Sequence, residues 1–392
     1  MPTNYEHHPD HPLATAFPYF PPAEQTWLAN ELSQILNSQL AMGPRVAKFE
    51  QEFAAYCGAQ FGVAFPSCTS SMEAALIALG VKAGDEVLVP VETFIATGMV
   101  VTLTGATPVF TEIDQKTFSM DFDDAWARVT DKTRGAIVVH FGGHISPGLP
   151  QFIKRMHESG RFVIEDAAHA PGAELGGKRA GSFGDAGCFS FYPTKIMTTG
   201  EGGMLTTSRE DVARVARSLQ NRGRDMDSRD EKYVLAGRNN RFTEIAAAMG
   251  LSQLRCLPEF LERRRAVAAI YDELLLKSEV FMPLLAEDGD APSYWRYVAT
   301  PTIEVDRVAL RDKLAEDKIT IDWAYDPPLH LQPVYQTTRG TKPGMLPQAE
   351  KIMSRHICLP VHARMRDEDA VYVAERIIHH TLSLAKALHQ TT

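Results

Sequence analysis

The sequence lacks several features that would mark common classes of protein. Its 392 residues contain no dense run of lysine and arginine, and the formal net charge is −9, which argues against nucleic acid and anionic membranes as partners. The five cysteines are scattered without a CxxC pair, so neither a metal site nor a disulfide framework is predicted. The most apolar stretch, 94–110, is too short to span a bilayer.

The composition is that of an ordinary globular protein, with 44% hydrophobic and 23% charged residues. The first residues, MPTNYEHHPDHP, are polar and contain no apolar signal region, so we expect a cytoplasmic protein. A chain of this length suggests two domains.

Short apolar segments with the character of strands alternate with helical segments over the first 210 or so residues. We expect strands at 61–65, 86–90, 107–113, 135–141, 161–166, 187–191 and 202–207. Uniformly apolar strands between helices are typical of a mostly parallel sheet that is covered on both faces. The predicted fold class is therefore α/β.

The last third of the chain has a different pattern. It is mainly helical from residue 208, and beyond residue 290 it contains predicted strands at 297–303, 319–325 and 356–361 and a final helix at 369–388. A smaller α+β domain fits this pattern. We expect an irregular lead-in over 1–22, a large domain over 23–260 and a small C-terminal domain over 261–392.

Polar residues stand at the carboxyl ends of two predicted strands, where ligands bind in doubly wound sheets. Thr69 and Ser70 follow the strand 61–65 at the start of a helix, whose free N–H groups suit a phosphate, although an ordinary helix cap is the alternative. Asp166 ends the strand 161–166, and His169 follows it. A carboxylate at this position needs a partner, which is either a helix N-terminus or a cationic ligand atom.

A single lysine, Lys195, lies in the stretch FSFYPTKIMTTGEGG at 189–203. Apolar surroundings lower the pKa of a lysine and make its amine a nucleophile, whereas an ordinary surface lysine is the alternative. A phosphate cradle, a carboxylate and an isolated lysine, in this order on strand ends, match the needs of pyridoxal phosphate (PLP). No GxGxxG or GxxxxGK[ST] motif stands at the first strand-to-helix turn, which argues against a dinucleotide or nucleoside triphosphate site there.

These residues lie in longer motifs that resemble those of the DegT/DnrJ/StrS aminotransferases. The resemblance runs from MGPRVAKFE (42–50) to CLPVHARM (358–365), through GDEVLVPVETFIAT, IEDAAHAPGAELGGKRAGSFGDAGCFSFYPTK, GEGGML and GRNNRFTEIAAAMGLSQL. It implies PLP fold type I, with a seven-stranded sheet. It also implies a homodimer with shared active sites that takes small-molecule substrates.

The resemblance implies a role for each matching residue. Lys195 would form a Schiff base with PLP and move a proton, Asp166 would pair with the pyridine nitrogen, and His169 would hydrogen-bond near the ring hydroxyl. The other cofactor contacts would be Phe94 stacking on the ring, Thr69, Ser70 and Ser190 on the phosphate, and Asn239 reaching the phosphate from the neighbouring subunit.

Two further positions are expected to face the substrate, and one departs from the family. Tyr325 and His330, in AYDPPLHLQPVY, would contact the sugar or the nucleotide, with packing as the alternative. Cys68 stands where many relatives have glycine, and a role for its thiol stays open.

The resemblance implies transfer of an amino group, with glutamate as the expected donor, to a nucleotide-linked keto sugar. His169 favours amination at C-4. A cyclitol or another ketone that carries no nucleotide is an alternative acceptor. The related sugar 3-dehydratases replace the lysine with histidine, and a non-catalytic regulator would be expected to lose Lys195 or Asp166, so both are disfavoured here.

Overall fold

The computed structural model describes residues 5, 6, 8, 12–287 and 289–391, and its main feature is a central sheet. Within these residues the sheet has seven strands in the order β1-β9-β8-β5-β4-β2-β3. Each begins and ends within two residues of its predicted segment. Their bounds are β1 Phe61–Phe65, β2 Glu86–Pro90, β3 Thr107–Thr111, β4 Thr133–Val139, β5 Phe162–Asp166, β8 Ala186–Ser190 and β9 Gly203–Thr207.

Most neighbouring strands of this sheet run parallel. Strand β2 pairs in parallel with β3 and β4, β4 with β5, and β5 with β8. Strand β9 runs antiparallel to both of its neighbours, β8 and β1. The predicted α/β class with a mostly parallel seven-stranded sheet is confirmed.

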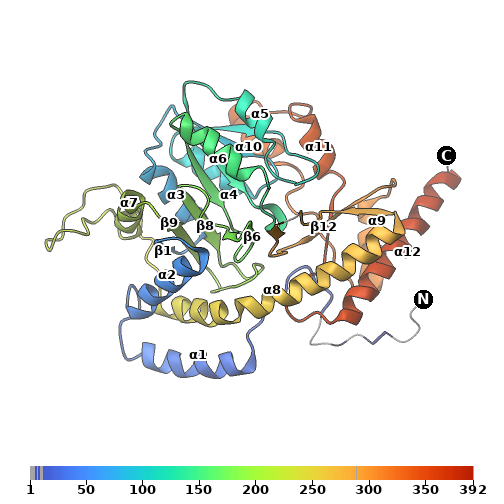
Figure 1. The fold of residues 1–392 in the computed structure, drawn as a ribbon, viewed down its shortest axis with the longest axis horizontal. Coiled ribbons are helices and arrows are strands. Elements are labelled where there is room, and N and C mark those ends of the chain that lie inside the picture. Colours follow the sequence, from blue (N-terminus) through green and yellow to red (C-terminus); the bar gives the residue numbers. More distant parts are fainter. Residues whose placement is uncertain (1–4, 7, 9–11, 288, 392) are drawn as a thin grey trace.

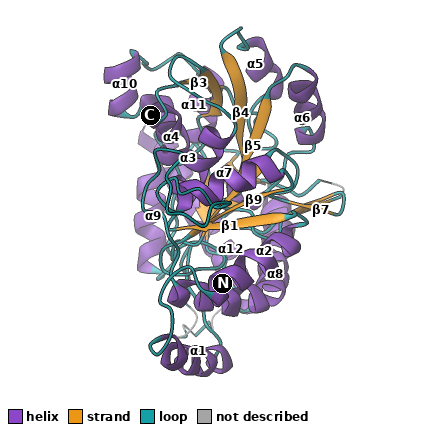
Figure 2. Cartoon of the chain, turned by 90° about the vertical axis from the view of Figure 1, so that its left-hand side faces the viewer, coloured by secondary structure: helices purple, strands orange, loops and turns teal. Residues whose placement is uncertain are grey.

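Helices cover both faces of this sheet (Figure 2). Successive side chains of a strand point to opposite faces, so Val87 and Val89 of β2 enter one core and Leu88 enters the other. Helices α3, α4 and α7 pack into the first core, and α2, α5 and α6 pack into the second. Their bounds are α2 Pro44–Cys57, α3 Cys68–Ala78, α4 Ile95–Leu103, α5 Phe122–Ala127, α6 Leu149–Glu158 and α7 Glu210–Gln220.

A 35-residue helix, α8 (Glu244–Ser278), leads from the large sheet to a second group of elements (Figure 1). There, Val267 and Tyr271 of α8 share a core with Val373 and Ile377. The predicted division after residue 260 falls inside α8 and stays a prediction. The group contains the sheet β10-β12-β13, with β10 Phe281–Pro283, β12 Tyr297–Pro301 and β13 Ile357–Leu359, and the helices α9 Arg307–Glu316 and α12 Asp367–Thr391.

Smaller elements complete the fold. They are α1 Pro22–Ile35, β6 Glu174–Leu175, β7 Lys178–Arg179, β11 Asp290–Ala291, α10 Pro333–Arg339, α11 Pro347–Met353 and the short 3-10 turns Phe141–Gly143 and Leu329–Leu331. Among the described helices, none has both the length and the apolar character that a membrane span requires.

The prediction of a strand over 319–325 is wrong. This segment forms isolated bridges, from Ile319 to Leu13 and from Asp322 to Cys358. Ile319 and Ile321 enter the core beside α8 and α12, and Tyr325 adopts a φ of 65°. Because that left-handed backbone ends an extended segment, the chain turns here instead of adding a strand.

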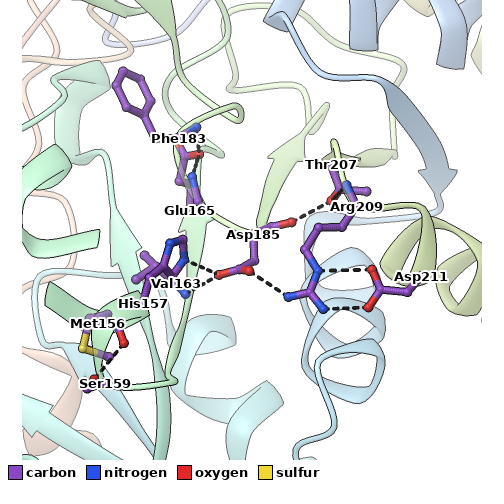
Figure 3. A network of polar contacts seen from close by, with 11 residues as sticks. Met156, His157, Ser159, Val163, Glu165, Phe183, Asp185, Thr207, Arg209 and Asp211 are labelled. Carbon is purple, nitrogen blue, oxygen red and sulfur yellow. Dashed lines mark hydrogen bonds and ion pairs between the residues drawn. The ribbon is translucent and has the colours of Figure 1, made fainter. Parts of the chain in front are cut away.

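The amino ends of the central strands are tied together by Asp185, which precedes β8 (Figure 3). Its carboxylate accepts a hydrogen bond from the backbone N–H of Val163 at 2.9 Å and pairs with His157 of α6 at 3.0 Å and with Arg209 at 2.8 Å. Arg209 forms a bidentate ion pair with Asp211 in the first turn of α7. This network fixes the edge of the sheet opposite to the carboxyl ends.

A buried carboxylate from α8 caps the start of α2. Gly43, at the N-cap of α2, has no side chain to offer, and Glu244 accepts hydrogen bonds from the backbone N–H groups of Gly43, Arg45 and Val46 at 2.9–3.1 Å. Glu244 is fully buried. An acidic group there also complements the positive end of the helix dipole.

Replacing Glu244 with alanine should therefore lower the free energy of unfolding by about 3 kcal/mol, because buried N–H groups lose their acceptor. Urea unfolding would measure this change. Glu259→Ala, at an exposed position of the same helix, is the matched control and should change stability by less than about 0.5 kcal/mol. Equal losses in the two variants would contradict the capping role.

Candidate active site

A cavity of about 570 Å³ opens at the carboxyl ends of β5 and β8, and the second group of elements supplies part of its wall. Among the residues predicted from sequence, it is lined by Thr69, Phe94, Asp166, His169, Ser190, Lys195 and Tyr325. Ser67, Cys68, Thr97, Trp295, Arg296 and Asp322 also line it. Segments that are far apart in sequence therefore meet at one place.

Asp166 is buried at the end of β5, and three groups surround its carboxylate. The Thr97 hydroxyl donates to Oδ2 at 2.8 Å, the Ala168 N–H donates to Oδ1 at 3.2 Å, and the Cys68 thiol lies 4.0 Å from Oδ1. Burial raises the pKa of Asp166, while the hydrogen bond from Thr97 acts in the opposite direction. A cationic ligand atom at this carboxylate would favour its charged form.

Lys195 follows β8 and brings its amine over the ring of Trp295, with Nζ 4.3 Å from the ring centroid. The pKa of Lys195 is lowered to about 8, mainly by burial; the nearby Arg296 charge acts in the same direction, and Asp166 opposes both effects. The free amine is therefore accessible near neutral pH, as the sequence argument for a nucleophilic lysine requires.

His169 is held in a stack of aromatic rings. Its imidazole lies 3.7 Å from Trp295, at an interplanar angle of 11°, and its Nε2 is 2.7 Å from the Tyr325 hydroxyl. Burial lowers the pKa of His169 well below its usual value, so the ring is neutral at physiological pH. Within the described part of the chain, its buried Nδ1 has no hydrogen-bond partner.

The start of α3 lies where the sequence predicts a phosphate-binding turn. Ser67 is the N-cap, and its hydroxyl accepts from the N–H of Ser70 at 3.1 Å, so the capping role falls on Ser67 and not on Thr69 or Ser70. Gly203 of β9 approaches this turn so closely that a Cβ would lie 2.3 Å from the carbonyl carbon of Ser67. Any larger residue at position 203 would therefore displace the turn at Ser67.

Three predicted residues do not line the cavity as the described chain shapes it. Ser70 lies one residue beyond the lining position Thr69. Asn239 is exposed on the loop between α7 and α8, where it forms a bridge with Asn221. His330 is buried in a turn, with its Nε2 3.0 Å from Glu350.

Sequence reasoning missed several residues of the cavity wall. Thr97 had a detectable signal, because it lies three residues after Phe94 and one helical turn brings both to the same end of α4. Trp295, Arg296 and Asp322 had no such signal. They lie more than a hundred residues from Asp166 and reach it only through tertiary packing.

Comparison with known proteins identifies the relatives of this chain. A model of the DegT/DnrJ/EryC1/StrS aminotransferase family matches residues 22–378. The chain belongs to this family. The DegT/DnrJ/EryC1/StrS relatives include GDP-perosamine synthase from Caulobacter vibrioides, which is 36% identical over 335 residues, covering 84% of this chain and 88% of that protein.

Two further DegT/DnrJ/EryC1/StrS relatives match over nearly the whole chain. The dTDP-4-dehydro-2,3,6-trideoxy-D-glucose 4-aminotransferase from Saccharopolyspora spinosa is 32% identical over 373 residues, covering 90% of this chain and 94% of that enzyme. A Streptococcus pneumoniae protein assigned as a sugar aminotransferase, in its PMP form, has a TM-score of 0.88 at 28% identity, covering 95% of this chain and 100% of that one. The same protein is also known in a PLP form.

The DegT/DnrJ/EryC1/StrS enzymes are PLP-dependent aminotransferases, and the cavity residues of this chain fit the cofactor. An amine of lowered pKa, a buried carboxylate and a helix start approached by Gly203 are the donor set that PLP requires. Phe94 is 57% exposed within the cavity wall, and His169 offers an unpartnered Nδ1 among the described atoms. These groups would offer bound PLP a surface to stack on and a further hydrogen-bonding atom.

The partly buried amine of Lys195 should destabilise the cofactor-free protein at neutral pH. Its pKa falls from 10.5 to about 8 on folding, so between these pH values the unfolded chain holds the proton that the folded chain has lost. The free energy of unfolding should then rise with pH across this interval. Lys195→Met should stabilise the cofactor-free protein by about 2 kcal/mol at pH 7, and this gain should vanish above about pH 10.5.

Urea unfolding at a series of pH values measures this difference. Lys154→Met, at an exposed lysine of α6, is the control and should show no pH-dependent gain. A Lys195→Met protein that is less stable than wild type at pH 7 would show that the amine is not strained by burial.

Proposed function

We propose that this aminotransferase moves an amino group from glutamate to a nucleotide-linked keto sugar, at C-4, in amino-sugar biosynthesis. The observation that carries the proposal is the meeting of Lys195, Asp166 and His169 in one cavity that also has room for a large substrate. The names of the relatives from Caulobacter and Saccharopolyspora support a nucleotide-linked sugar, and the name of the Saccharopolyspora enzyme, a 4-aminotransferase, supports the C-4 position. The free thiols of all five cysteines support a cytoplasmic location.

Bound PLP would supply an electron sink and a carrier for the amino group. Asp166 would hold a proton on the pyridine nitrogen, with Thr97 fixing the orientation of the carboxylate. Lys195 would hold the cofactor covalently and then move the proton between the substrate carbon and the cofactor carbon. Phe94 would cover one face of the ring, and His169 would donate or accept at the ring hydroxyl.

The remaining contacts of the proposal are those with the cofactor phosphate and with the substrate. Thr69, Ser70 and Ser190 would bind the phosphate, and Tyr325 would contact the sugar or nucleotide while it orients His169. His330 is kept as a proposed substrate residue, although its present contact is with Glu350.

We also propose a homodimer with shared active sites. The loop that follows α7 extends away from the body of the chain (Figure 1), and Asn239 is exposed on it. Its exposure leaves the amide free to reach the phosphate cradle of a second copy. Arg241 donates to Asn221 at 3.1 Å and steadies the base of this loop.

Replacing Asp166 with alanine should lower turnover by at least ~10²-fold while some cofactor stays bound, because the pyridine nitrogen loses its anion. Thr97→Val removes one hydrogen bond to this carboxylate and should cost about tenfold. The measurement is the visible absorption of the cofactor, followed during turnover. Near-normal activity of Asp166→Ala would refute the assigned role.

The acceptor is tested on the wild-type protein by the same absorption. The PLP-bound protein is expected to be yellow, and glutamate should bleach this colour. One nucleotide keto sugar from a panel of 3-keto and 4-keto compounds should restore it. Bleaching that no nucleotide sugar reverses would reject the proposed acceptor and favour a cyclitol or another ketone. A protein that never shows the yellow form, like a Lys195→Ala control, would reject the catalytic proposal.

Shared active sites predict complementation between two inactive variants. Lys195→Ala and Asn239→Asp subunits, unfolded and refolded together, should form hybrid dimers in which one site has both native residues. The Lys195→Ala parent lacks the amine, and the Asn239→Asp parent places a negative charge at the phosphate, so neither parent should be active. The mixture should be active, because each hybrid dimer has one site with both native residues. If mixing restores nothing while each parent still forms dimers, Asn239 acts within its own subunit or not at all.

A further inference from the structure

The cavity contains a second buried cation, Arg296, that the reaction outlined above does not use. Arg296 is 6% exposed, lies just before β12 and lines the cavity. Its guanidinium carbon is 4.2 Å from the centroid of Trp295, the same ring that Lys195 Nζ approaches to 4.3 Å. The two cations are therefore neighbours on one indole.

The guanidinium is held in place by two carbonyl oxygens and one carboxylate. Nη1 donates to the carbonyl oxygens of Thr15 at 2.8 Å and of Trp295 at 3.3 Å, and Nη2 pairs with Asp322 at 3.2 Å. Thr15 also donates from its hydroxyl to Asp322 at 3.0 Å. Over the described residues, Nε of Arg296 and Oδ1 of Asp322 have no hydrogen-bond partner.

The N-terminal segment thus contributes to the site, although its sequence gave no functional signal. Thr15 is fixed because Leu13 is buried beside Ile319 and its carbonyl accepts from the N–H of Thr320 at 2.8 Å. Burying a guanidinium costs free energy unless it is paired, and one half-exposed aspartate pairs it only in part. Such a cation in a substrate cavity is suited to bind an anion.

We propose that Arg296 binds a carboxylate of the amino donor, and that Thr15 and Asp322 position its guanidinium. This rests on the proposed aminotransfer from an amino acid. The donor carries its α-carboxylate on the carbon that bears the amino group, so this anion comes close to Lys195, as Arg296 does. The diphosphate of a sugar nucleotide is separated from the reacting carbon by the sugar ring. The planar guanidinium also matches the two oxygens of a carboxylate.

The donor half of the reaction tests the proposal without any sugar. Holoenzyme is mixed with glutamate or with 1-aminopropane, which has an amine and no carboxylate, and the change in cofactor absorption is timed. Arg296→Met should slow the reaction with glutamate by roughly 10- to 100-fold and leave the reaction with 1-aminopropane within about threefold of wild type. Arg296→Lys keeps the positive charge but loses the planar guanidinium. Its rate with glutamate should lie between those of Arg296→Met and wild type.

Binding gives a readout besides reaction. Glutarate, a dicarboxylate without an amine, should bind the wild-type holoenzyme, and calorimetry should show at least about tenfold weaker binding to Arg296→Met. Thr15→Val removes the hydroxyl contact with Asp322 but keeps the Thr15 carbonyl, so it should weaken glutarate binding less. Arg264→Met, at a buried arginine bound to the carbonyls of Tyr294 and Val361, is the matched control and should leave the glutarate affinity unchanged.

The outcomes separate this proposal from the proposed function. If Arg296→Met slows both amines equally, or leaves glutamate and glutarate unaffected, the carboxylate role is overturned. If Arg296→Met does not fold, the same comparison with Arg296→Lys decides. A wild-type enzyme that reacts with glutamate but aminates no nucleotide sugar would refute the proposed acceptor and leave the Arg296 test intact.

Discussion

The removal of Lys195 and Asp166 from water is the constraint on which the site depends. Burial disfavours the charged form of both groups, so it lowers the pKa of the amine and raises that of the carboxylate. Their attraction for each other opposes both shifts. The state of the pair is therefore decided by a few neighbours, namely the hydroxyl of Thr97, the charge of Arg296 and whichever ligand occupies the cavity.

The rest of the fold holds Lys195 and Asp166 close to each other at the same edge of the sheet. Strand β5 carries Asp166, and its parallel neighbour β8 leads into the segment that carries Lys195. Asp185 ties the opposite edge of these strands to α6 and α7, so the polar network that fixes the sheet lies away from the cavity. The carboxyl edge is left to bind ligands, and the long helix α8 brings the second wall over it.

Much of the site could be predicted because parallel strands bring all their carboxyl ends to one edge. Thr69, Asp166 and Lys195 are spread over more than a hundred residues, yet each ends or follows a recognisable strand, so the α/β pattern brings them to the same edge of the sheet. The prediction of a strand at 319–325 was wrong because an alternating apolar pattern reports burial and not strand pairing. Ile319 and Ile321 are buried in the core beside α8 and α12, and burial does not distinguish a strand from an irregular chain that packs equally well.

The sequence by itself determined the fold class and the family, because these depend on local periodicity and on motifs whose spacing is fixed by the chain. The wall formed by Trp295, Arg296 and Asp322, and the support that Thr15 gives to it, were decided only by the tertiary structure. These contacts join segments that share no local pattern. Their positions follow from how the second group of elements packs on α8, and no short stretch of sequence encodes that packing.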